Sequence, residues 1–97
     1  MDKLKKFELM EKIVRQLEDL KNSQQAILEK ISNIEVENIE VEDKNLENTL
    51  PEIHQRTADN LSAIERLVEE FGAKTTDFGE KNNVASLREQ QELNRSK

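Results

Sequence analysis

Apolar residues recur every three or four positions over the first third of the chain, from Leu4 to Ile34. That spacing places them along one face of an α-helix. No Gly or Pro interrupts residues 1–34, and the positions between the apolar ones are mostly charged or amide side chains. The pattern predicts one long amphipathic helix, and its apolar face needs a partner because a lone helix has nothing to bury that face against.

A seven-residue repeat within this helix is typical of a coiled coil. With Met10 at position a, seven of the eight a and d positions are apolar. Isoleucine at most d positions favours three or more strands over a parallel dimer, so we expect a trimer. The exception, Gln24, either forms a polar layer that fixes the register or marks a hydrated stretch. The predicted oligomer seam in this helix comprises Met10, Ile13, Leu17, Leu20, Gln24, Ile27, Ile31 and Ile34.

A five-residue duplication, Asn-Ile-Glu-Val-Glu at 33–37 and again at 38–42, breaks this pattern. Apolar and acidic residues alternate within each copy, as they do in strands. Because five is odd, a straight strand would turn the two copies to opposite faces, so a bend at Asn38 is needed. The helical alternative gives a poor seam and brings four glutamates close together. We therefore favour an extended, acidic linker over residues 35–48.

A second helix is predicted after this linker. The sequence Thr49-Leu50-Pro51-Glu52 fits a capping box, with the proline in the first turn. Apolar residues then follow at helical spacing up to Gly72, which can end the helix in a left-handed conformation. The expected segments are a coiled-coil helix over 1–34, the linker over 35–48 and a second amphipathic helix over 49–72. The predicted seam positions of the second helix are Leu50, Ile53, Leu61, Ile64, Leu67 and Val68.

Residues 73–97 are predicted to form a polar docking tail. The segment from Val84 to Leu93 can form a short helix with few apolar anchors. Aromatic anchors contribute disproportionately to interfaces, so Phe71 and Phe78 are the better candidates for docking a partner. The apolar residues of the tail, Val84, Leu87 and Leu93, are the further candidates. The expected fold class is mostly α: an elongated coiled coil of two long amphipathic helices, an acidic linker, and a short C-terminal helix or tail.

The composition of the chain limits how much apolar surface it can bury. The chain has 97 residues, 34% hydrophobic and 37% charged, which suits one small domain with a thin apolar seam. The net charge is −6, and residues 35–53, with seven acids and one base, account for all of it. Such a chain repels nucleic acid and anionic membranes, and we expect neither as a partner. Its apolar runs are too short for a signal peptide or a spanning helix, so we expect a soluble protein.

The residue types also exclude most catalytic chemistry. There is no Cys, Trp or Tyr, and only one His and two Gly, so a thiol or zinc site and a glycine-rich phosphate loop are excluded. His54 has no second histidine to share a metal, and surface solvation is the simpler interpretation of Glu65, Glu69 and Glu70. We predict no catalytic residue, no cofactor and no metal, and we expect that the protein is not an enzyme.

These observations favour a structural or assembly protein. Such a protein would associate with itself and with another protein component of a larger particle, and viral fibres, collars and scaffolds are often built in this way. The alternative is a small acidic helical hairpin that inhibits or regulates a target by filling a basic groove on it. Against the hairpin, a connection over residues 35–48 is longer than the two to eight residues that are usual.

Overall fold

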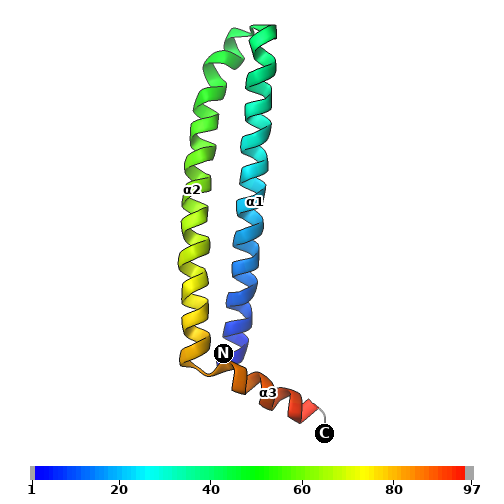
Figure 1. Cartoon of the computed structure of the whole chain (residues 1–97), viewed down its shortest axis with the longest axis vertical. Helices are drawn as coiled ribbons and strands as arrows, with labels where there is room; N and C mark the ends of the chain where they lie inside the picture. The colour runs from blue at the N-terminus through cyan, green and yellow to red at the C-terminus, as the bar shows by residue number, and fades with distance from the viewer. Residues whose placement is uncertain (1, 96–97) are drawn as a thin grey trace. The chain divides into compact units, whose positions relative to one another are not determined.

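Residues 2–95 are described by a computed structural model, in which three α-helices follow one another (Figure 1). They are α1 (Lys3–Val41), α2 (Lys44–Lys81) and α3 (Val84–Arg95). The mostly α-helical fold class is confirmed, and so is the short helix that begins at Val84. Three helix boundaries differ from those expected. The first helix ends after residue 34, and the second begins before residue 49 and ends after residue 72.

Helix α1 runs without a break through the first copy of the repeat and through all but the last residue of the second. The extended linker predicted for residues 35–48 is therefore wrong. Helical geometry brings Ile31, Glu35 and Asn38 to one side, where Ile31 and Asn38 are buried and Glu35 is half-buried. Repulsion between neighbouring surface glutamates costs only about 0.2–0.5 kcal/mol per pair, which continued helical hydrogen bonding and this burial offset.

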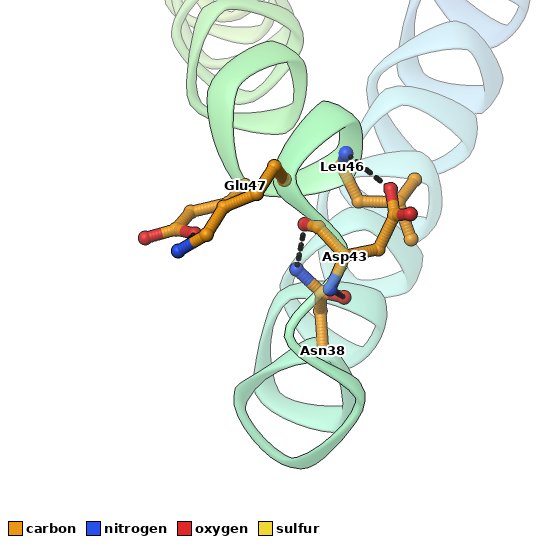
Figure 2. Close-up of polar contacts among 5 residues, drawn as sticks. Asn38, Asp43, Leu46 and Glu47 are labelled. Atoms are coloured by element: carbon orange, nitrogen blue, oxygen red, sulfur yellow. Dashed lines mark hydrogen bonds and ion pairs between the residues drawn. The ribbon is translucent and has the colours of Figure 1, made fainter.

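A two-residue turn, Glu42–Asp43, joins α1 to α2. Glu42 has a φ of 61°, in the left-handed region that ends many helices. The Asn38 side chain closes the turn: its Oδ1 accepts from the Asp43 N–H at 3.0 Å, and its Nδ2 donates to the Asp43 carbonyl at 3.1 Å (Figure 2). With both polar atoms paired, Asn38 can remain 8% exposed without an unsatisfied group.

Asp43 is also the residue that starts α2. Its Oδ2 accepts from the Leu46 N–H at 2.9 Å, which is the usual contact of a helix N-cap (Figure 2). The start predicted at Thr49 is wrong because the chain already has this better-placed carboxylate cap six residues earlier. Pro51 consequently lies inside α2, where it gives up one helical hydrogen bond.

The end of α2 also differs from the prediction. Gly72 lies within the helix and does not have a positive φ, so the stop predicted there is wrong. The helix ends nine residues later, at Lys81, and the turn to α3 uses Asn83 with a φ of 50°. Asparagine tolerates this conformation better than most residues, and the side chain of Asn82 donates to the Phe78 carbonyl at 2.9 Å. The polar connector expected after Gly72 is therefore mostly helical.

The chain divides into two compact units. One comprises residues 18–66, in which the end of α1 and the start of α2 lie side by side and antiparallel (Figure 1). The other comprises residues 1–17 with 67–97, which contribute the start of α1, the end of α2 and α3. Cores are thin: the buried apolar side chains are Leu4, Ile31, Leu50 and Val84, and no described side chain is completely buried.

The left-handed turn residue gives a test of the chain reversal. At a φ of 61°, a Cβ atom costs about 1–2 kcal/mol, whereas within a helix Gly is less stable than Ala by about 0.5–1 kcal/mol. We expect Glu42→Gly to unfold at a higher urea concentration than Glu42→Ala, with a free energy of unfolding larger by about 1 kcal/mol. Both variants are measured by circular dichroism at equal protein concentration. Both variants remove the same charge. If the alanine variant is as stable as the glycine variant or more stable, the left-handed turn at Glu42 is contradicted.

Candidate interaction surfaces

His54, the single histidine, connects the two helices of the 18–66 unit. Its Nδ1 lies 2.7 Å from Oε1 of Glu35, and both side chains are partly buried. An ionised carboxylate can only accept, so Nδ1 donates this hydrogen bond. This contact puts residues 35 and 54 at the same level of the antiparallel pair. The single histidine therefore links α1 to α2.

The three neighbouring glutamates near the middle of α2 face solvent. Glu65, Glu69 and Glu70 are exposed on α2, as expected for a solvated helix face. Among residues 2–95, no group of three or more potential ligands could hold a metal ion.

The inner face of the 18–66 unit contains the side chains that α1 and α2 turn toward each other. On α1 this row repeats at intervals of three and four, and on α2 it does the same. Several of its members are polar, including Gln24, Asn38 and Thr57. From α1 the row comprises Lys21, Gln24, Leu28, Ile31, Glu35 and Asn38, and from α2 it comprises Leu50, His54, Thr57, Leu61 and Ile64.

The predicted seam of the first helix divides between two environments. Its a positions are half-buried or, for Ile31, buried. Its d positions are open, with Ile13, Leu20, Ile27 and Ile34 each 42–44% exposed. The seam of the second helix divides in the same way, since Leu50 is buried and Leu61, Ile64 and Val68 are half-buried, while Ile53 and Leu67 are 39% and 49% exposed.

The most exposed aliphatic side chains on α1 lie next to the turn. Val36, Ile39 and Val41 are 65–72% exposed. They alternate with glutamates of the repeated sequence, so the end of this helix presents apolar and acidic groups together.

In the unit that contains residues 2–17 and 67–95, α3 is attached to the start of α1. Val84 is 3% exposed. The Arg88 guanidinium lies 5.1 Å from the centre of the Phe7 ring and is hydrogen bonded to the Glu11 carboxylate. A cation over an aromatic face is attracted to it, so one arginine makes two favourable contacts with α1.

The residues predicted to dock a partner differ in their exposure. Phe71, Phe78 and Leu87 are half-buried, and Lys6 Nζ lies 5.1 Å from the centre of the Phe78 ring. Val84 is buried within its own unit, whereas Leu93 is 61% exposed. Of the five, Leu93 is therefore the most open to a partner.

Three of these contacts are not predicted from the sequence. For Asn38 the sequence does contain a signal, because Asn near a helix end is a common turn residue, but the alternation around it indicates a bend in a strand. Arg88 contacts both Phe7 and Glu11, and Glu11 is 77 residues away from it in the sequence. No local spacing predicts such a pair.

Comparison of the chain with models of known families, with curated proteins and with solved structures finds no match. Among the described residues, no helix combines the length and apolar character needed to cross a lipid bilayer.

The two glycines of α2 give matched variants for the Phe7 packing. A Cβ atom at Gly79 would lie 2.6 Å from Cε1 of Phe7, whereas one at Gly72 would meet nothing within 4 Å. We expect Gly72→Ala to raise the free energy of unfolding by about 0.5–1 kcal/mol through helix propensity. Gly79→Ala should lose that gain and be less stable than the wild type in the same urea titration. Equal stabilisation by both alanines would show that the Phe7 ring does not pack on Gly79.

Proposed function

We propose that this chain is a non-enzymatic structural or assembly protein that acts by associating with itself and with another protein. The observation that carries the proposal is the large number of aliphatic side chains that a single chain leaves open. Among residues 2–95, twelve large hydrophobic residues are at least 37% exposed, whereas four hydrophobic residues are buried. Burial of apolar surface is the main favourable contribution to protein association, so a second protein surface would stabilise this arrangement.

Polar layers in the inner face support the same proposal. Gln24, Thr57 and Asn38 occupy positions that a self-sufficient helical pair would fill with leucine or isoleucine. Such layers add little apolar burial while they fix the register. In this proposal the pair contributes a defined scaffold, and further stability comes from association.

The second candidate function is a small acidic hairpin that fills a basic groove on a target. The two-residue turn favours this candidate. The sequence argues against a hairpin only if the connection spans residues 35–48, and a two-residue connection is within the usual range. Exposed Val36, Ile39 and Val41 beside acidic side chains suit a groove that is apolar at its base and basic at its rim.

Sedimentation equilibrium separates these candidates. If the chain is an assembly protein, we expect a homo-oligomer at micromolar concentration whose dissociation constant changes little with added salt, because apolar burial is not screened. The three-copy state that the heptad pattern predicts is measured in the same experiment. A folded monomer at these concentrations would contradict the assembly function and leave the acidic hairpin as the better candidate.

A further inference from the structure

Two rows of exposed aliphatic side chains lie on the same side of the 18–66 unit. The contact between Glu35 and His54 aligns the two helices, and the residues immediately before them, Ile34 and Ile53, are 43% and 39% exposed. When two helices are antiparallel, positions that precede facing residues are rotated to the same side of the pair. Ile34 and Ile53 are therefore neighbours on one face.

Seven-residue spacing extends this face along both helices. On α1 the row is Leu20, Ile27, Ile34 and Val41, and on α2 it is Leu46 and Ile53, all at least 37% exposed. The next position on α2 in this row is Asn60, which is also exposed. We call this surface the outer face. It leaves roughly 500 Å² of apolar surface open, which is the size of the largest apolar patch on a typical monomer, and such patches are often functional.

The outer face is nearly free of acidic groups although the unit around it is acidic. Residues 18–66 contain twelve acids and five bases, a net charge of −7. The helical positions that flank the two rows carry only three charges, Lys30, Glu37 and Arg56. Most of the remaining acids lie on the other sides of the helices, and Glu42 and Asp43 lie in the turn at one end of the two rows. A basic partner would be drawn to those sides, whereas the outer face suits an apolar surface of nearly neutral charge.

We infer that the outer face binds the outer face of a second copy of this chain, which forms a four-helix assembly of two hairpins. This inference rests on the proposed homo-oligomeric function and names the surface that performs it. The acidic sides of two copies then stay in solvent, while Lys30 and Arg56 of one copy can pair with the acid flanking the other. Specific complexes bury about 800 Å² per partner, so the apolar patch would form the centre of such an interface and the flanking polar positions its rim.

The number of copies follows from the geometry of a single patch. A surface that binds its own equivalent is used up when two copies meet, so association closes at a dimer. The heptad pattern predicts three copies for a bundle to which each chain supplies one helix at each level. Since each chain supplies two, two copies already enclose a four-helix core.

The test compares two double variants of the full chain by sedimentation equilibrium. Ile34→Glu with Ile53→Glu places two charges in the outer face. The control, Val36→Glu with Ile39→Glu, adds the same charge at more exposed aliphatic positions on other sides of α1. We expect the outer-face variant to raise the dimer dissociation constant at least about 100-fold, with the control within about threefold of the wild type.

A third variant should strengthen the dimer. Asn60→Leu completes the aliphatic row of α2 and should lower the dissociation constant about tenfold, and this result does not depend on a destabilised protein remaining folded. A wild-type oligomer that survives the outer-face charges, or that contains three or more copies, would overturn the inference while leaving the assembly function intact. A monomeric wild-type chain would overturn both.

Discussion

The reversal of the chain at Glu42–Asp43 is the constraint on which the other features of the 18–66 unit depend. Asn38 satisfies the backbone of the turn, and Asp43 caps the helix that follows. Together they stop α1 and start α2 within two residues, so the two helices must be antiparallel neighbours. Which side chains are buried and which remain open then follows from helical periodicity alone.

Pairing within one chain divides the apolar stripe of α1 in two. The inner part, which contains Gln24 and Asn38 as well as Ile31, packs against α2. The outer part is the more uniformly aliphatic one, with Leu20, Ile27 and Ile34 open. A helix whose better apolar face is exposed is poorly stabilised on its own. This imbalance is the physical reason to regard the chain as a component of an assembly.

Much of the secondary structure could be predicted from the sequence, whereas its connections could not. Three- and four-residue spacing correctly indicated helices, and Val84 correctly indicated the last one. The turn was missed because Glu42 adopts a left-handed conformation without being Gly or Asn. The repeat alternates like a strand because its aliphatic residues do not all share one side of the helix. Glu35 and Asn38 face α2, whereas Ile34, Val36, Ile39 and Val41 are exposed. Contacts such as Arg88 with Phe7 join distant parts of the chain, and no local pattern encodes them.

The distance between Ser23 and Ser62 tests the chain reversal most directly. Both side chains are exposed, and the chain has no cysteine, so Ser23→Cys with Ser62→Cys accepts two spin labels at defined sites. Labelled protein is diluted with excess unlabelled protein, and the distance within one chain is measured by pulsed electron paramagnetic resonance. Adjacent helices of about 10–12 Å diameter predict a distance of roughly 25 Å or less, whereas a continuous rod predicts about 60 Å. The longer distance would contradict the account.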